Sequence, residues 1–165
     1  MSFIYFDTSA LVKRYVEEKG TEVVDELFDA RRATEFLAIS VLTAVELKSA
    51  LRRLVKGGKI RETQYKDLIS AFSKDIPSLS LILPVDNTLL EEAAATLEAH
   101  ALRAGDAIHF ASILRVKQIA ENTEQPLIVV TSDFELGHAC QESGLAVLDP
   151  EEDKAAERLR GMMKR

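Results

Sequence analysis

The sequence predicts an α/β domain of three layers, in which helices cover both faces of a mainly parallel central sheet of about five strands. Short apolar runs alternate with longer amphipathic segments along the chain, an order that implies right-handed crossovers between parallel strands. The runs over 3–6 and 127–130 contain no charged residue, which is typical of strands buried on both faces. No repeat, low-complexity segment or linker divides the chain, so one domain is expected.

The first third of the chain is expected to begin with a strand over 3–6 and a short helix over 9–17. A second helix is expected over 22–32, because its apolar residues fall on one face. The apolar run over 36–40 predicts a strand. Residues 41–56 then show the apolar spacing of a helix that buries a wide face.

The middle of the chain is expected to hold an amphipathic helix over 60–76 and a strand over 79–83. An alanine-rich helix over 88–99 follows. Either Asp86 or Asn87 is its expected N-cap, since both residue types accept hydrogen bonds from the first free N–H groups of a helix.

The last third is expected to hold two helices and two strands. They cover 106–119, 127–130, 134–142 and 145–148. We assign residues 1–149 to a single domain and residues 150–165 to a charged C-terminal tail. The tail has helical propensity but few apolar residues, so it is expected to be mobile or to dock weakly.

Composition and charge narrow the class of protein. Of the 165 residues, 47% are apolar and 29% are charged, as in a globular domain with a full core. The chain shows no signal peptide and no apolar run long enough to span a bilayer, so we expect a cytoplasmic protein with no membrane partner. The single cysteine, Cys140, is expected to pack in the core. A net charge of −6 argues against general coating of nucleic acid but is compatible with an acidic pocket that binds cations.

Four carboxylates stand at positions where a ligand site is expected. Asp7 and Asp133 follow two strands at their carboxyl ends, where open α/β sheets bind ligands. Glu46 and Asp106 lie among apolar residues of two helices, where an unpaired charge is unfavourable. Clustered carboxylates raise one another's pKa values, and a divalent ion relieves the repulsion. Oxygen ligands suit Mg²⁺ or Mn²⁺ rather than zinc.

Each of these residues also has a simpler interpretation. Asp7, Asp106 and Asp133 are all placed to cap the helices that follow them, and capping is compatible with metal binding. Glu46 is alternatively a solvated helix residue. His109, one turn after Asp106, is expected to be a packing or hydrogen-bonding histidine. None of these interpretations explains why the four acids occur together.

Four segments in order resemble the acidic motifs of PIN-domain ribonucleases, and most closely those of the VapC-type toxins of prokaryotic toxin–antitoxin pairs. They are Asp7-Thr-Ser-Ala-Leu, Ser40-Val-Leu-Thr-Ala-Val-Glu46-Leu, Leu102-Arg-Ala-Gly-Asp106-Ala-Ile-His-Phe-Ala and Val130-Thr-Ser-Asp133-Phe-Glu-Leu. Each motif alone is weak, but four with this order and spacing are specific. The resemblance covers residues 3–149, and the tail beyond Asp149 departs from it.

The resemblance implies a parallel sheet between helices and a site for one or two Mg²⁺ or Mn²⁺ ions. It implies hydrolysis of single-stranded RNA that leaves a 5′-phosphate and a 3′-hydroxyl. Carried over by position, Asp7, Glu46, Asp106 and Asp133 are the acidic metal ligands. Thr131, which is otherwise simply a β-favouring residue, is the catalytic hydroxyl of the last motif. The resemblance also implies a homodimer and a cognate antitoxin that covers the site.

An RNA substrate requires local positive charge despite the acidic total. Basic residues cluster around Gly57-Gly58 and follow the first motif. We predict phosphate contacts from Lys13, Arg14, Lys48, Arg52 and Arg53. The alternative is a solvated, charged helix face.

Three other functions remain open from the sequence. A phosphotransfer domain would use Asp7 as its nucleophile, but a haloacid-dehalogenase-type phosphatase needs an aspartate where this chain has Ser9. A receiver domain needs a lysine after a late strand, and the segment 127–133 has none. A PIN-fold binding or scaffold module and a housekeeping or DNA-directed nuclease of the same family are the remaining alternatives.

Overall fold

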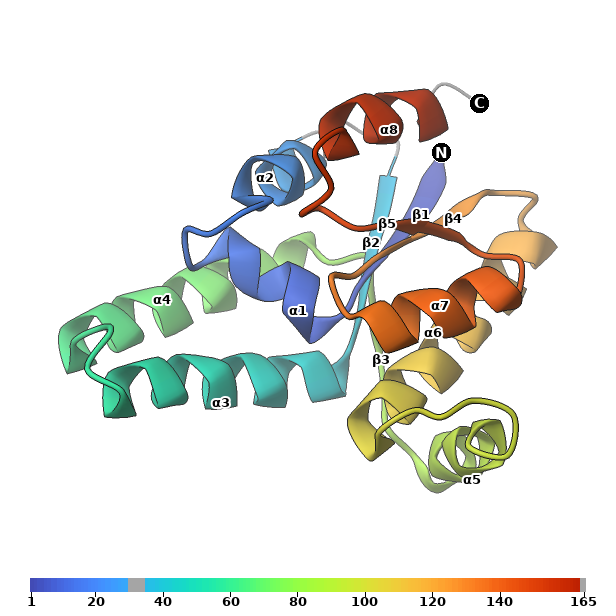
Figure 1. The fold of residues 1–165 in the computed structure, drawn as a ribbon, viewed down its shortest axis with the longest axis horizontal. Helices are drawn as coiled ribbons and strands as arrows, with labels where there is room; N and C mark the ends of the chain where they lie inside the picture. The colour runs from blue at the N-terminus through green and yellow to red at the C-terminus, as the bar shows by residue number, and fades with distance from the viewer. Residues whose placement is uncertain (30–34, 164–165) are drawn as a thin grey trace.

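The computed structural model describes residues 1–29 and 35–163, and in them five strands form one all-parallel sheet in the order β3-β2-β1-β4-β5 (Figure 1). The strands are β1 (Ser2–Phe6), β2 (Glu35–Ser40), β3 (Leu81–Leu83), β4 (Leu127–Val130) and β5 (Ala146–Leu148). The predicted parallel α/β fold is therefore confirmed. The chain steps outward from β1 to β3 and then crosses back to β4 on the other side of β1, so the strand order reverses between β1 and β4.

Helices cover both faces of the sheet (Figure 1). They are α1 (Thr8–Leu11), α2 (Thr21–Asp29), α3 (Val41–Lys56), α4 (Glu62–Asp75), α5 (Asn87–Thr96), α6 (Ala104–Asn122), α7 (Phe134–Glu142) and α8 (Ala155–Met162), with 3₁₀ turns η1 (Val12–Arg14) and η2 (Ile76–Ser78). Alternate side chains of β1 separate the two cores, as the two-residue period of a strand requires. Ile4 and Phe6 pack with α1, α2, α3 and α8, whereas Phe3 and Tyr5 pack with α6 and α7.

Most predicted elements match these bounds, and the differences lie at their ends. The helix predicted over 9–17 is the short α1 followed by a 3₁₀ turn. The predicted end of the helix over 22–32 lies outside the described residues, which stop at Asp29. Asp86, not Asn87, caps α5, accepting a hydrogen bond from the N–H of Leu89 at 2.7 Å. Cys140 is buried in the core, as predicted. No helix of the described part is long and apolar enough to cross a membrane.

The C-terminal tail docks more extensively than its composition predicts. Helix α8 places Ala155 and Leu159 in the same core as Ile4 and Phe6. The composition of the tail does not predict this contact, because two buried apolar residues in a charged segment are enough to anchor one helical face. The Arg158 guanidinium also donates to the carbonyl of Val147, at 3.0 Å.

Gly20 allows the start of the tail to approach the N-terminal helices. Its φ of +91° is unfavourable for a residue with a side chain. A Cβ atom here would lie 2.6 Å from the carbonyl oxygen of Pro150. The position is therefore restricted to glycine by conformation and by contact with the tail.

Truncating Leu159 tests whether the tail is part of the folded core. Because this side chain is fully buried, Leu159→Ala is expected to lower the free energy of unfolding by about 2–4 kcal/mol. Urea denaturation measures the change. Glu157→Ala, an exposed position on the same helix, is the control, and equal stability of the two variants would contradict docking of α8.

Candidate acidic active site

The reversal of strand order sets the position of the site. Ligands of open α/β sheets bind beyond the carboxyl ends of the strands at such a switch point. Asp7 directly follows β1, and Asp133 lies three residues after β4. Glu46 comes from α3 and Asp106 from the first turn of α6. All four carboxylates line one hollow of about 510 Å³, which we call the acidic pocket.

Asp7 is both a helix cap and a pocket residue. Its Oδ1 accepts a hydrogen bond from the N–H of Ala10 at 3.0 Å, and both carboxylate oxygens accept from the Ser9 hydroxyl at 2.9 Å. Burial raises the pKa of Asp7, and the nearby His109 and these hydrogen bonds oppose that rise. The capping interpretation is thus correct, and it leaves the carboxylate facing the pocket.

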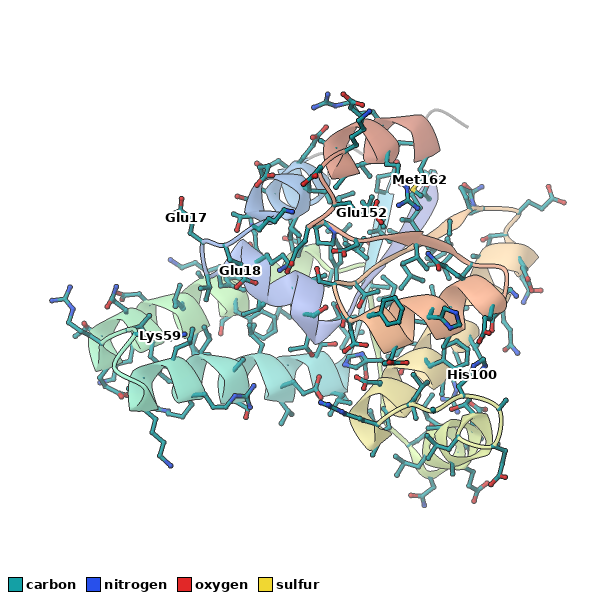
Figure 2. All side chains as sticks on the ribbon, in the orientation of Figure 1. Glu17, Glu18, Lys59, His100, Glu152 and Met162 are labelled. Atoms are coloured by element: carbon teal, nitrogen blue, oxygen red, sulfur yellow. The ribbon has the colours of Figure 1, made fainter. Side chains whose placement is uncertain are left out.

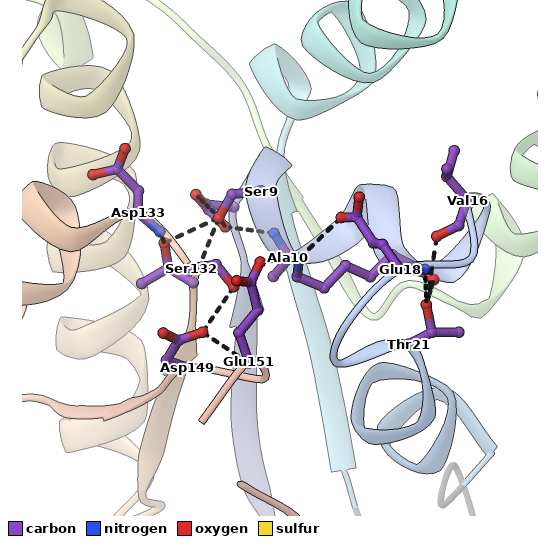
Figure 3. A network of polar contacts seen from close by, with 12 residues as sticks. Ser9, Ala10, Val16, Glu18, Thr21, Ser132, Asp133, Asp149 and Glu151 are labelled. Atoms are coloured by element: carbon purple, nitrogen blue, oxygen red, sulfur yellow. Dashed lines mark hydrogen bonds and ion pairs between the residues drawn. The ribbon is translucent and has the colours of Figure 1, made fainter. Parts of the chain in front are cut away.

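A polar network joins Ser9 to the loop after β4 (Figure 3). The N–H of Ser132 donates to Ser9 Oγ at 2.8 Å, and the Ser132 hydroxyl donates to Asp149 Oδ1 at 2.8 Å. Asp133 caps α7 by accepting from the N–H of Leu136 at 2.9 Å. Two segments about 120 residues apart are therefore fixed to each other beside the pocket.

Thr131 stands behind Asp133 in this network. Its side chain is buried, and its Oγ1 accepts a hydrogen bond from the N–H of Asp133 at 3.0 Å. This contact shapes the backbone that carries Asp133. The same hydroxyl lies 3.4 Å from the Ser9 hydroxyl, and its hydrogen bond to Asp7 helps to lower the pKa of that carboxyl.

Asp106 is half-buried among the other acids of the pocket. The N-cap of α6 is Arg103, so the prediction that Asp106 caps the helix is wrong: α6 begins two residues earlier than predicted, and Asp106 lies within its first turn. Burial raises the pKa of Asp106, and the negative charge of Asp133 raises it further, with smaller contributions from Asp7 and Glu46.

Glycine at position 105 brings α6 against α3. A Cβ atom there would lie 3.0 Å from Glu46 Oε1, closer than ordinary van der Waals contact. Because position 105 has no side chain, the start of α6 lies against Glu46 without displacing its carboxylate.

His109 holds Glu46 by a half-buried hydrogen bond. Its Nε2 lies 2.9 Å from Glu46 Oε2, and Nε2 is the donor because a carboxylate only accepts. Its Nδ1 lies 2.9 Å from the Tyr5 hydroxyl, and the Thr8 hydroxyl also donates to Glu46 Oε2. These hydrogen bonds, that of His109 first, lower the pKa of Glu46. The prediction of a hydrogen-bonding histidine is confirmed, although no sequence pattern pointed to Glu46 as its partner.

Thr8, Ser9 and Tyr5 are the residues of the site that sequence reasoning missed. None carries a charge, and each acts by contacting a carboxylate or its partner. The polar pair directly after Asp7 was the one available signal for Thr8 and Ser9. Nothing in the sequence connected Tyr5 to His109, 104 residues away.

Two of the predicted RNA-binding residues form salt bridges with carboxylates of this chain. The Lys13 side chain is only 2% exposed and forms salt bridges with Glu18 at 2.9 Å and Glu151 at 2.6 Å. Arg14 contacts three aspartates, which are Asp25, Asp29 and Asp75. Both side chains join structural elements here, so phosphate contacts from Lys13 and Arg14, which stay a prediction, would compete with these salt bridges. Sequence neighbours did not reveal this because Glu151 and Asp75 lie far along the chain.

The other three predicted RNA-binding residues lie on α3. The α3–α4 hairpin projects from the sheet, with Lys59 at its turn (Figure 2). Arg53 lines the acidic pocket, and Lys48 is exposed. Arg52 instead forms a salt bridge with Glu62 at 2.6 Å and lies 3.9 Å over the Tyr65 ring. Arg53 is thus the predicted cation best placed beside the carboxylates.

Comparison with known families agrees with this architecture. The family model for the PIN domain matches residues 4–142, which is most of the chain. The protein therefore belongs to the PIN-domain family.

Curated relatives narrow the assignment within that family. Ribonuclease VapC45 of Mycobacterium tuberculosis (strain CDC 1551 / Oshkosh) is 30% identical over 116 residues, which are 70% of this chain and 78% of the relative. Ribonuclease VapC49 of M. tuberculosis (strain ATCC 25618 / H37Rv) matches to the same extent. The chain is thus of VapC type.

Solved structures share the fold at lower identity. FitAcB from Neisseria gonorrhoeae is 20% identical with a TM-score of 0.60, covering 89% of this chain and 97% of that chain. A toxin–antitoxin complex from Klebsiella pneumoniae contains a chain 17% identical with a TM-score of 0.57, covering 90% of this chain and 98% of that one.

Removing one of the crowded charges should stabilise the protein when no divalent ion is present. Asp106→Asn is expected to raise the melting temperature in chelator by about 2–4 °C, the shift for about 1 kcal/mol at this chain length. Because the pKa of Asp106 is raised in the folded state, the wild-type protein loses stability as pH rises through that pKa. The difference in melting temperature between the wild-type and Asp106→Asn proteins should therefore shrink as pH falls.

Differential scanning calorimetry in chelator across acidic and neutral pH measures this effect. Asp67→Asn, on the exposed surface of α4, is the matched control. A destabilised Asp106→Asn protein at neutral pH would contradict repulsion within the pocket.

Proposed function

We propose that this protein is a divalent-metal-dependent endoribonuclease that cleaves single-stranded RNA as the toxin of a toxin–antitoxin pair. One observation carries the proposal: carboxylates from four separate segments line one pocket. In residues 1–29 and 35–163, none of Asp7, Asp106 and Asp133 forms a salt bridge with lysine or arginine. Membership of the PIN-domain family and likeness to proteins named ribonuclease support the reaction class.

The chemistry of the donor set fits Mg²⁺ or Mn²⁺. The carboxylates of the pocket are hard oxygen ligands, and a bound cation would relieve their mutual repulsion. Within the described ranges, no three acidic, histidine or cysteine side chains are already arranged to hold an ion. Mg²⁺ in proteins keeps several waters and takes few direct protein ligands. Asp7, Asp106 and Asp133 would hold it, with Glu46 joining directly or through water.

A bound divalent ion would lower the pKa of a water molecule and stabilise negative charge on the phosphate. Asp106 or Asp133 would orient that water for attack on phosphorus, displacing the 3′-oxygen and leaving a 5′-phosphate and a 3′-hydroxyl. Thr131 and Ser9 would hold the loops of Asp133 and Asp7. His109 would keep Glu46 in place from behind. Arg53 would contact a phosphate beside the one that is cleaved.

Proteins of similar structure support a set of partners for this chain. Structures of this fold include a toxin–antitoxin complex, FitAB bound to an IR36 DNA fragment, and VapBC2 from Rickettsia felis bound to a promoter DNA fragment. We therefore propose a cognate antitoxin that covers the pocket, a homodimer, and action in the cytoplasm. We also propose that residues 1–149 form the nuclease unit, with the tail as a structural support.

Replacing Asp7 tests the reaction directly. Asp7→Asn keeps the size of the side chain and the helix cap but removes a charge from the pocket, so cleavage of single-stranded RNA should fall at least ~100-fold. Chelator should abolish cleavage by the wild-type protein, and Mg²⁺ or Mn²⁺ should restore it. Labelled RNA resolved on denaturing gels measures both effects.

Asp67→Asn serves as the matched control and should cut at the wild-type rate. Cleavage in chelator, or full activity of Asp7→Asn, would reject the proposed mechanism. RNA binding without cleavage under any divalent ion would point instead to a non-catalytic PIN-fold module. Growth arrest on expression that Asp7→Asn abolishes would separate a toxin from a housekeeping nuclease.

Neighbouring arginines on α3 test the path of the RNA backbone. Arg53 lines the acidic pocket, whereas Arg52 is held by Glu62. Arg53→Gln should raise KM for RNA several-fold and reduce the salt slope of binding by about 0.7, the value for one phosphate contact on a single strand. Arg52→Gln should change both much less. Equal effects of the two variants would contradict a specific role for Arg53.

A further inference from the structure

An exposed aromatic side chain stands directly beside the acidic pocket. Phe134 is the first residue of α7 and is 78% exposed, more than any other large hydrophobic side chain of the described residues. An isolated exposed apolar residue is common on protein surfaces. The neighbours of Phe134 distinguish this one, because it follows Asp133, which lines the acidic pocket.

Phe134 and His138 form a pair of rings on one face of α7. Their centroids lie 6.1 Å apart with an interplanar angle of 25°. Glu142, one turn further on, lies 3.6 Å from the His138 ring nitrogen Nδ1. The stacked pair offers a flat, partly supported aromatic surface to solvent.

The two rings line a second hollow, of about 200 Å³, which we call the aromatic groove. Asp133 lines both the aromatic groove and the acidic pocket, so the two hollows are neighbours across one side chain. Adjacent Cα atoms are about 3.8 Å apart. A ligand phosphate at the carboxylates would therefore place the next nucleotide within reach of Phe134.

The charge of the aromatic groove favours a base over a phosphate. Asp149 and Glu152 line it, and no lysine or arginine does so among the described residues. Carboxylates repel phosphate but accept hydrogen bonds from the N–H groups of base edges. Arg53, the cation beside the carboxylates, comes from α3 rather than α7.

We propose that the aromatic groove is a nucleobase subsite, in which a base next to the cleaved phosphate stacks on Phe134. This inference rests on the proposed ribonuclease function. The sugar–phosphate backbone would pass on the Arg53 side, and the base would turn toward α7. Stacking tolerates any base. The subsite therefore positions the RNA strand at the carboxylates without selecting a particular base.

Kinetics on one short RNA with a mapped cleavage site test the subsite. Base–aromatic stacking is worth about 1–3 kcal/mol by alanine substitution, so Phe134→Ala should lower kcat/KM by about 5- to 150-fold. The loss should appear mainly in KM, and Phe134→Tyr should restore most of it. Leu90→Ala, at an exposed apolar residue of α5, should match the wild-type protein.

An abasic RNA completes a double-mutant cycle. Removing the base next to the cleaved bond should slow the wild-type enzyme, whereas Phe134→Ala should lose little more, because the stacked partner is already absent. An unchanged KM in Phe134→Ala would overturn the subsite, and so would additive losses in the cycle. Either result would overturn it even if sedimentation showed that Phe134→Ala weakens self-association. Absence of RNA cleavage by the wild-type protein would reject the ribonuclease function itself, which is a separate outcome.

Discussion

Repulsion among four carboxylates is the constraint on which the rest of this structure depends. The parallel sheet brings Asp7 and Asp133 to one edge, and two helices bring Glu46 and Asp106 to the same hollow. Burial is the first cause of the raised pKa of Asp106, and the negative charges of Asp133, Asp7 and Glu46 raise it further. A fold that keeps such a cluster gives up stability at a site where a cation would regain it.

The surrounding residues hold the carboxylates in place against this repulsion. Ser9 ties Asp7 to the loop after β4, and His109 ties Glu46 to the buried Tyr5. These hydrogen bonds are buried or half-buried, where they are stronger than in water. The scaffold therefore fixes Asp7 and Glu46 before any ligand binds, which reduces the rearrangement that an active site needs.

The sequence predicted the sheet and the four pocket residues because both depend on local pattern. Apolar runs ending in an acidic residue mark strand ends, and parallel strands bring those ends together. The contact between Glu46 and His109 was beyond sequence reasoning because it joins helices 63 residues apart. The burial of Lys13 depends on its salt bridge with Glu151. The docking of α8 depends on two buried apolar residues in a charged segment. Tertiary contacts of this kind decide whether a charged residue faces solvent.

The most direct test is a crystal structure of the protein soaked in Mn²⁺, with anomalous diffraction recorded at the manganese edge. The account predicts an anomalous peak in the acidic pocket, within coordination distance of at least one of Asp7, Asp106 and Asp133. It also predicts that the peak disappears in Asp7→Asn. A pocket without manganese at saturating concentration, or manganese bound only elsewhere on the surface, would contradict the account.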